Sequence, residues 1–241
     1  MAIRFDAVGD RFFRISDLLD YGSAYTVCFW LRLSVDMDAY VNFFSLNDDS
    51  DDNIDYLGTI SDGTTLQLYV ATGGSAASQN GTNLSVGTWY HVSIVRESLT
   101  VAKFYVNGIL DGTVTKDVTG RTSVTRMDVA LAHSSANYQF NGLVADVKAW
   151  SSALTIEELK NEMWTVLPRR FANIYGFWPC FSGAIRLKDY SGNGRDWTAG
   201  GTLTDESSPP VSWGMQSFNF YPASSPIVSV VPQRALLGAG L

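Results

Sequence analysis

Apolar and polar residues alternate with a period of two along several short stretches of the chain, and this pattern predicts β-strands. Residues 26–34 place one set of side chains on one face, Val27, Phe29, Leu31 and Leu33, and another on the opposite face, Cys28, Trp30 and Arg32. The same alternation occurs in residues 65–71, 90–96, 103–107 and 143–150. Each stretch therefore predicts a strand with one face toward a core.

Turn-forming residues separate these stretches. Gly73-Gly74, Asn80-Gly81 and Asn107-Gly108 are the kind of short polar clusters that connect strands. Asn107-Gly108 tolerates the positive φ of a type I′ turn, which reverses the chain tightly. No strand–helix–strand spacing is present, so an antiparallel β-sandwich is the predicted class.

One helix is predicted after the last long strand. Thr155 is positioned to cap its N-terminus, with Glu158 three residues on as its partner in a capping box. Ile156, Leu159 and Met163 fall on one helical face, so this face is expected to pack on an edge or end of the sandwich.

The composition changes after Glu206, which divides the chain into a sandwich domain, 1–206, and a C-terminal arm, 207–241. Five of the seven prolines lie in the arm, and its only charged side chain is Arg234. Proline disfavours inner strands. The arm is also too apolar to be a solvated linker, so we expect an interaction element that lies on a surface, its own or a neighbour's, through Trp213, Phe218, Phe220, Tyr221 and Arg234.

Composition and charge exclude several classes of protein. Hydrophobic residues make up 46% of the 241 residues and charged residues only 17%, as in a globular protein. The net charge of −7 opposes nucleic-acid binding. Neither a secretory leader nor an apolar stretch long enough for a membrane span is present, so a soluble protein is expected. Cys28 and Cys180 have no metal-ligand spacing, which predicts two buried thiols.

Four separated motifs resemble one known family. They are W-Y-H-V-S-I-V-R with K-F-Y-V-N-G (89–96 and 103–108), F-N-G-L-V-A-D-V-K-A-W (140–150), A-L-T-I-E-E-L (153–159), and Y-G-F-W-P-C-F with D-Y-S-G-N-G-R-D (175–181 and 189–196). Together they resemble the laminin-G-like, pentraxin-like jelly roll of the concanavalin A-like lectin/glucanase superfamily, of the kind found in microbial and phage proteins. The resemblance covers residues 1–204 and implies two antiparallel sheets.

The same fold carries both glycosidases and lectins, so the site residues decide between them. A glycosidase needs two carboxylates at short spacing on one strand, and no such pair occurs among the glutamates, Glu97, Glu157, Glu158, Glu162 and Glu206. Neither of the two histidines belongs to a recognisable Ser-His-Asp grouping. No catalytic residue is therefore predicted.

Calcium is the only cofactor that the sequence suggests. The resemblance implies a structural calcium ion held by Asp146 with a group near the start of the chain, for which Asp6 is the natural companion. The alternative is an Asp146 that is exposed, paired with Lys148 or bonded to a backbone donor. The acidic loop 47–55 lacks the glycine and glutamate of an EF-hand; its five aspartates are expected to be mainly solvated, with a calcium-binding role as the alternative. Asp189, Ser191, Asn193 and Gly194 are expected to form a turn.

Sugar binding requires aromatic rings that face solvent. The alternation places five such side chains on the non-core faces of their strands, Trp30, Tyr69, Trp89, His91 and Tyr105. They are candidates for a glycan groove, unless the helix or the arm covers them and they serve packing instead.

Three functional hypotheses follow. The first is a non-enzymatic virion protein for surface decoration, assembly or attachment, which interacts through its arm with other virion subunits or with itself. The second is a secreted or surface-displayed carbohydrate-binding module that binds a cell-surface glycan. The third is a glycoside hydrolase. The first places the protein on a virion surface, and the second at a cell surface or outside the cell; no nucleic-acid or membrane partner is expected.

Overall fold

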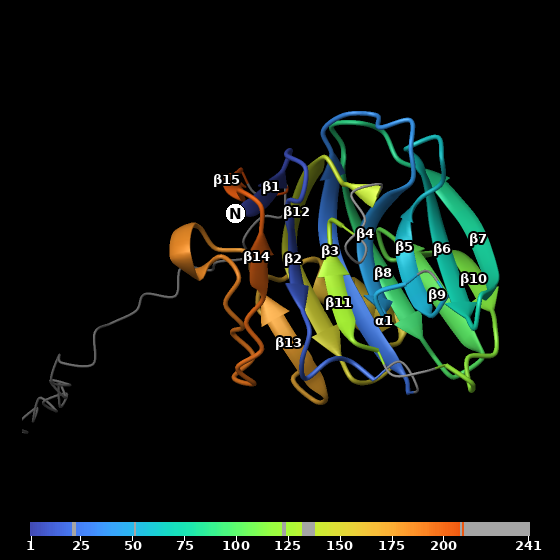
Figure 1. Ribbon diagram of the computed structural model, residues 1–241. Coiled ribbons are helices and arrows are strands. Elements are labelled where there is room, and N and C mark those ends of the chain that lie inside the picture. Colours follow the sequence, from blue (N-terminus) through green and yellow to red (C-terminus); the bar gives the residue numbers. More distant parts are fainter. Residues whose placement is uncertain (21–22, 51, 122–123, 132–137, 208, 210–241) are drawn as a thin grey trace, which may run out of the picture.

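Two antiparallel sheets face each other across a single large core in the computed structural model (Figure 1). The structure describes residues 1–241 except 21–22, 51, 122–123, 132–137, 208 and 210–241. Of the predicted arm, only Ser207 and Pro209 are therefore described, and its five candidate interaction residues lie outside the described residues. The predicted all-β sandwich is confirmed.

Sheet A has eight strands in the order β10-β9-β8-β3-β12-β1-β15, with β13 also paired to β12. Its strands are β1 (Ala2–Phe5), β3 (Tyr25–Leu33), β8 (Trp89–Arg96), β9 (Val101–Val106), β10 (Ile109–Thr115), β12 (Gly142–Trp150), β13 (Ile174–Trp178) and β15 (Thr204–Glu206). Strands β1 and β13 share one edge of β12, because β1 pairs with its first half and β13 with its second half.

Sheet B has seven strands in the order β14-β2-β11-β4-β5-β6-β7. They are β2 (Arg11–Arg14), β4 (Val41–Asn47), β5 (Ile54–Thr59), β6 (Thr65–Thr72), β7 (Ser75–Asn83), β11 (Arg126–Val129) and β14 (Thr198–Gly200). Hairpins connect β4, β5, β6 and β7 in sequence. Asn80-Gly81, predicted as a turn, instead lies inside β7, where the side chain of Asp111 on β10 bonds to Thr82 and joins the edges of the two sheets.

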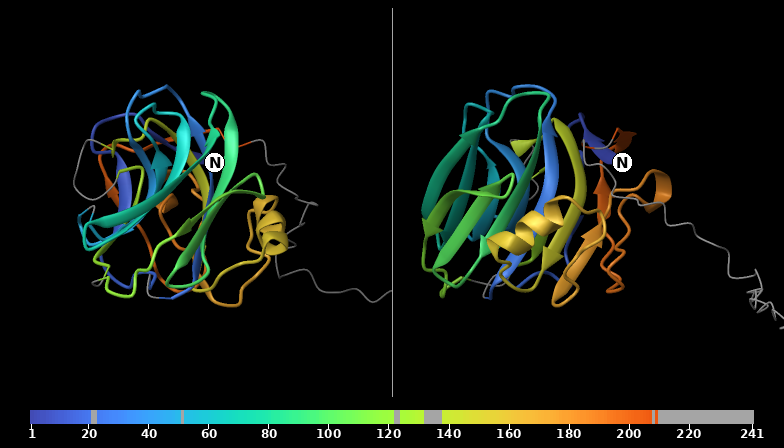
Figure 2. Two further views of the ribbon diagram at one scale, coloured as in Figure 1. Left: turned by 90° about the vertical axis from the view of Figure 1, so that its right-hand side faces the viewer. Right: turned by 180° about the vertical axis from the view of Figure 1, so that it is seen from behind.

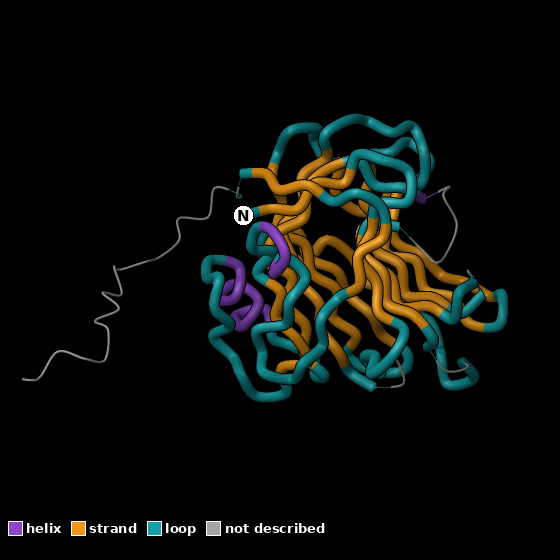
Figure 3. The backbone as a smooth tube through the Cα atoms, turned by 60° about the vertical axis from the view of Figure 1, so that its left-hand side comes forward, coloured by secondary structure: helices purple, strands orange, loops and turns teal. Residues whose placement is uncertain are grey.

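The α-helix α1 (Ile156–Met163) lies on the outer face of sheet A, and Figure 2 shows it crossing that face. In Figure 3 the strands form two layers and α1 lies outside them. The predicted capping box is present, because Glu158 N–H donates to the Thr155 hydroxyl and the Glu158 carboxylate accepts from the Thr155 N–H. Leu159 and Met163 are buried against the sheet, whereas Ile156 is partly exposed.

The core between the sheets is apolar except at one point, where a buried ion cluster joins them. Asp55 on β5 accepts hydrogen bonds from Arg96 on β8 at 2.8 and 2.5 Å, from Arg121 at 2.9 Å and from the Tyr25 hydroxyl at 2.6 Å. Burial alone raises the pKa of Asp55, but the two guanidinium groups outweigh this effect and lower it. The expectation that the whole acidic loop is solvated is therefore wrong for Asp55.

A β-bulge interrupts the predicted alternation in β12. Ala145 pairs with Trp30 and Lys148 with Cys28, so Asp146 and Val147 together oppose a single residue of β3. Asp146 has a φ of 52°, and beyond it Val147 faces the core. The regular alternation predicted for residues 143–150 is thus wrong at this point, because the extra residue puts Leu143 and Ala145 on the outer face and Val147 on the core face.

Three smaller predictions are confirmed. Asn107 and Gly108 both have positive φ, as a type I′ turn requires. Cys28 and Cys180 are free and buried. Asp189 accepts from the backbone N–H groups of Phe177, Ser191 and Arg195 and from the Ser191 hydroxyl, so the D-x-S-G-N-G segment is a turn held by its own side chains.

Candidate functional site

Four of the five predicted sugar-binding aromatics lie on the outer face of sheet A, where α1 packs. Trp30 on β3 and His91 on β8 are neighbours, with ring centroids 5.4 Å apart. Only 5% of Trp30, 2% of His91 and 7% of Tyr105 is exposed, and Trp89 is half-buried. The expectation that these side chains face solvent is wrong for Trp30, His91 and Tyr105, because α1 and the residues after it cover them.

The contacts of these residues are those of a packed layer. The Trp30 indole N–H donates to the carbonyl of Met163 at the end of α1, at 3.3 Å. Burial, with a smaller effect of the Lys148 charge, lowers the pKa of His91 to about 3, so the imidazole is neutral at neutral pH. This face therefore contributes packing between a sheet and a helix.

A buried lysine ties α1 to this face. Lys148 Nζ donates to the carbonyl oxygens of Glu162 (2.9 Å) and Thr165, and it lies 3.1 Å from a carboxylate oxygen of Asp146. A carboxylate oxygen of Glu162 is 3.6 Å away, and the other accepts the backbone N–H groups of Arg169 and Arg170. The ammonium group thus binds the C-terminal end of the helix, where carbonyl groups lack partners.

Asp6 and Asp146 are not brought together. Asp6 follows the end of β1 that pairs with Gly142, whereas Asp146 lies at the other end of the β1–β12 pair, roughly 15 Å away at ~3.3 Å per residue. Asp6 pairs with Arg4 at 2.7 Å and Asp146 with Lys148. Burial raises the pKa of Asp146 to about 6, even though Lys148 lowers it. Of the alternatives for Asp146, the structure shows the pairing with Lys148.

The fifth candidate, Tyr69, lies on the outer face of sheet B, on the side of the sandwich away from α1. The register places one row of side chains straight across this sheet, from β2 to β6: Phe13, Asp128, Ser45, Tyr56 and Tyr69. Four strand spacings of ~4.8 Å separate its ends, roughly 19 Å in all. Aromatic rings therefore occupy both ends of the row and polar side chains its middle.

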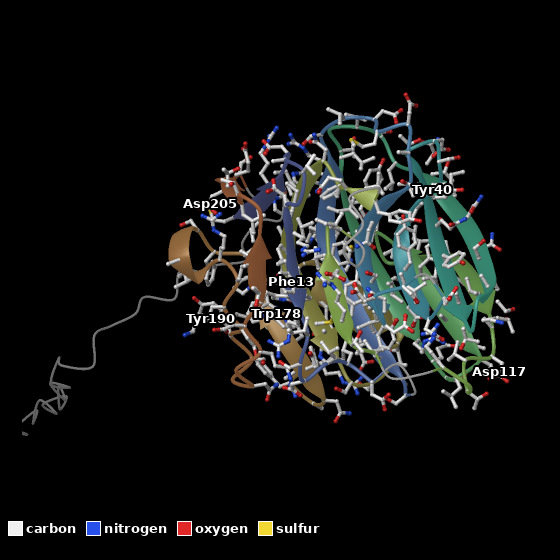
Figure 4. The ribbon with its side chains drawn as sticks, viewed as in Figure 1. Phe13, Tyr40, Asp117, Trp178, Tyr190 and Asp205 are labelled. Atoms are coloured by element: carbon white, nitrogen blue, oxygen red, sulfur yellow. The ribbon has the colours of Figure 1, made fainter. Side chains whose placement is uncertain are left out.

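At the β2 end of the row, Phe13 lies between two arginines. The guanidinium carbons of Arg11 and Arg126 are each 4.9 Å from the centroid of its ring. Arg126 also binds both carboxylate oxygens of Asp128, at 2.7 and 2.8 Å. Burial raises the pKa of Asp128 to about 6, although Arg126 acts in the opposite direction. Figure 4 shows Phe13 on β2, toward the left-hand side of this face.

At the β6 end, four tyrosines form a group that we call the tyrosine ledge: Tyr40, Tyr56, Tyr69 and Tyr138. The ring of Tyr138 lies 6.4 Å from that of Tyr40 and 6.1 Å from that of Tyr56, and Tyr56 is the cross-strand neighbour of Tyr69. Tyr40 is 47% exposed, and Tyr69 and Tyr138 are half-buried. Figure 4 shows Tyr40 at the upper end of the sheet.

Amide side chains accompany the ledge. Asn42 on β4 is fully buried and neither polar atom of its amide group has a hydrogen-bond partner. Gln67 and Asn80 bond to each other at 2.8 Å on the outer face of β6 and β7. The partly exposed rings and the Gln67–Asn80 pair provide the two kinds of contact, stacking and hydrogen bonding, that a sugar makes, whereas Asn42 is buried out of reach of a ligand.

Sequence reasoning found Tyr69 but missed the other members of this surface. Tyr56 lies on β5, where Asp55 points into the core and every residue is buried, so this strand has no alternation like that of β6. Phe13 lies on a strand of only four residues, and Tyr40 and Tyr138 lie outside the strands. For those three, alternation gave no signal.

Among the described residues, no three His, Cys, Asp or Glu side chains converge as the ligands of a metal ion would. No helix in the described part of the chain has the length and apolar character that crossing a membrane takes.

Comparison with known proteins identifies the family of the chain. A family model described as the concanavalin A-like lectin/glucanases superfamily matches residues 9–160. The chain belongs to this superfamily. The match includes both outer faces up to α1, and the laminin-G-like resemblance of the sequence motifs is confirmed. No curated protein matches the chain.

Three solved structures show the same superfamily fold. A heptameric SAP-like pentraxin from Limulus polyphemus has 17% identity and a TM-score of 0.61, over 88% of this chain and 96% of its own. A Bacteroides ovatus protein that has been proposed to bind carbohydrate has 17% identity and a TM-score of 0.64, over 86% of this chain and 60% of its own. The CBM40 of a Ruminococcus gnavus sialidase, bound to α2,3-sialyllactose, has 11% identity and a TM-score of 0.52, over 67% and 97%.

Proposed function

We propose that this protein is a non-enzymatic carbohydrate-binding domain that holds its glycan across the outer face of sheet B. The observation that carries the proposal is the row from Phe13 to Tyr69 on the outer face of sheet B, on the side away from α1: its two end rings, Phe13 and Tyr69, are partly exposed, whereas Asp128, Ser45 and Tyr56 between them are buried. A glycan lying along the row would contact both ends.

The chemistry of the row suits a sugar. A tyrosine ring offers an apolar face for the C–H groups of a pyranose and a hydroxyl for hydrogen bonding. The guanidinium groups of Arg11 and Arg126 lie against the Phe13 ring and add positive charge at this end of the row. The sialyllactose-bound CBM40 and the Bacteroides ovatus protein support the proposal as members of the same fold with carbohydrate as ligand.

The carboxylates support a binding role over hydrolysis. Asp128 is the acidic member of the row, and both its oxygens are held by Arg126. Glu162 is buried beneath α1, and Glu157 and Glu158 lie on the first turn of that helix, on the other side of the sandwich. Release of reducing sugar from β-glucans or galactans, abolished by one Asp or Glu substitution, would contradict this part of the proposal.

Glycan-array screening followed by calorimetry with the best ligand tests the binding surface. Tyr69→Ala and Phe13→Ala are each expected to weaken binding about tenfold, which corresponds to about 1.4 kcal/mol. Phe171→Ala is the matched control, because Phe171 is 63% exposed and follows α1, on the sheet A side. Binding that survives both sheet B substitutions, or that is lost with the control, would contradict the proposed surface.

The setting of the domain is a second part of the proposal. We propose a role in attachment or decoration on a virion surface, with a cell surface or the extracellular space as the alternative. The proline-rich arm, in which Arg234 is the one charged side chain, supports it, because such a segment suits lying on an apolar surface, that of its own domain or of a neighbour. Negative-stain images and light scattering of the full chain test assembly; a monomer at every concentration would contradict a role in assembly.

Calcium binding stays a prediction, tested by the melting temperature of metal-free protein with and without added calcium.

A further inference from the structure

The described chain leaves the sandwich at a defined place. Strand β15 pairs with β1, so Glu206 lies opposite Ala2 at the edge of sheet A. Glu206 accepts from Arg4 at 3.3 Å, and Ala2 packs in the same cluster as Trp30 and Met163. The chain therefore passes residue 206 beside the outer face of sheet A, next to the C-terminal end of α1.

Apolar side chains are exposed around this place. Trp164, the residue that ends α1, is 58% exposed, and its ring lies 6.2 Å from that of Trp30. Leu167 is 66% exposed and Met1 is 37% exposed. Trp89 is half-buried and packs against the cluster of Trp30 and Ala2. We call Met1, Trp89, Trp164 and Leu167 the exit patch.

The members of the exit patch border one apolar cluster. Trp89 packs against the cluster of Ala2, Trp30 and Met163, and the ring of Trp164 lies 6.2 Å from that of Trp30. Met1 directly precedes Ala2 in the chain, and Leu167 follows Trp164 by three residues.

The sequence beyond this place requires an apolar partner. Residues 210–241 carry one charged side chain, Arg234, and many large apolar ones. So long an apolar segment in water is an aggregation hazard. Pro209 is buried, so the chain remains against the domain three residues after β15 ends. The segment therefore begins beside an exposed apolar patch, which is the kind of surface that can bury its apolar side chains.

We propose that residues 210–241 dock on the exit patch of their own domain. Proline-rich segments bind surfaces lined with aromatic rings, because the extended backbone is already ordered and the prolines pack on the ring faces. Trp89 and Trp164 provide such rings. Trp213 follows Pro209 by four residues, a reach of roughly 12 Å at ~3.1 Å per residue, so it is the first aromatic side chain available to the patch.

Docking within one chain is favoured over docking on a neighbour by connectivity. A short connection makes the event intramolecular, with an effective concentration in the millimolar range. A neighbouring subunit must exceed that concentration to compete. The sequence prediction of an arm on a neighbour and the docking proposed here therefore differ in their dependence on protein concentration.

Limited proteolysis of the full chain by chymotrypsin tests the proposal, because Phe218, Phe220 and Tyr221 are cleavage sites within the segment. In the wild-type protein, cleavage there is expected to be slow. Trp164→Asp is expected to raise the cleavage rate at least tenfold, and Leu167→Ser, a milder change, at least threefold. Phe171→Ser is the control, as an equally exposed apolar residue outside the patch.

The thermal unfolding of each variant is measured in parallel, so that misfolding is recognised, and the Leu167 variant remains informative if the Trp164 variant fails to fold. Equal cleavage rates in wild-type and folded variant proteins would overturn the proposal. Protection of the segment from cleavage that appears only above a threshold protein concentration, together with a doubled mass by light scattering, would also overturn the proposal. In that case the segment would dock on a second copy.

Discussion

The outer faces of the two sheets are built from similar residues but differ in how far these residues are covered. Sheet A presents Trp30, His91 and Tyr105, which α1 covers. Sheet B, on the side away from α1, presents Phe13, Tyr40, Tyr69 and Tyr138, which are partly or largely exposed, while Tyr56 beneath them is buried. Alternation along a strand assigns a side chain to a face equally well in both sheets. What lies above the face decides whether an aromatic residue stabilises the fold or is available to a ligand.

Connectivity explains the difference. Strands β12 and β13 are antiparallel neighbours, and the segment between them contains α1, which must pass over one face of sheet A. The neighbouring strands β4 to β7 of sheet B are joined by hairpins, which place nothing over their faces. Substitutions on the two faces should therefore affect different properties, stability for sheet A and binding for sheet B.

The largest effect is expected where sheet A is tied to α1. Lys148→Met removes the ammonium group that binds Asp146 and the end of α1, and leaves a buried carboxylate without its partner. Such a change costs about 3–5 kcal/mol. Urea denaturation measures this cost, with Lys116→Met as the exposed control. A loss of unfolding free energy below about 1 kcal/mol would indicate that the stability of sheet A does not depend on its contact with α1.

His91 makes the same face sensitive to acid. Its pKa is near 3 in the folded protein and about 6.5 unfolded, so the unfolded state binds the proton first as the pH falls. Its contribution to stability is fully present above pH 6.5 and is lost progressively toward pH 3, by about 3 kcal/mol at pH 4. Comparing the pH dependence of unfolding for wild-type and His91→Gln proteins isolates this effect, and identical profiles would refute it.

Asp128 on sheet B is expected to act with the opposite sign. Burial raises its pKa to about 6 in the folded state, above the unfolded value near 3.9, so the folded state binds the proton first. The contribution of Asp128 to the free energy of unfolding is present below pH 4. It is lost as the pH rises to 6, by about 2–3 kcal/mol. Asp128→Asn should therefore flatten this part of the stability profile. A profile that keeps the wild-type slope would show that Asp128 titrates normally.

The smallest effect is expected at the start of α1. Thr155→Ala removes the hydroxyl that accepts from the Glu158 N–H, at a cost of about 1 kcal/mol. Thr155→Ser keeps the acceptor and serves as the control. Thermal melting measures both, and glycan binding should be unchanged in both, because α1 lies behind the proposed surface. Weaker binding by the alanine variant would mean that the two faces are coupled.

Much of the fold was predictable from the sequence because it depends on local patterns. The faces of residues 26–34, the turn at Asn107 and the capping box of Thr155 each follow from a few adjacent residues. The covered state of Trp30 was not predictable, because α1 is 126 residues further along the chain, and its docking depends on the packing of the whole sheet. Tyr40 and Tyr138 join the tyrosine ledge for the same long-range reason.

The bulge at Asp146 has a consequence for aligning this chain with its relatives. Two residues of β12 oppose one residue of β3 there, and the side chains before and after keep the faces of a regular strand. Asp146 is thus equivalent to a one-residue insertion. A relative without it would present the same core and outer residues, so the gap in an alignment belongs at position 146. Such a relative would also lack the carboxylate that Lys148 binds, and loss of both residues together is the substitution pattern to expect.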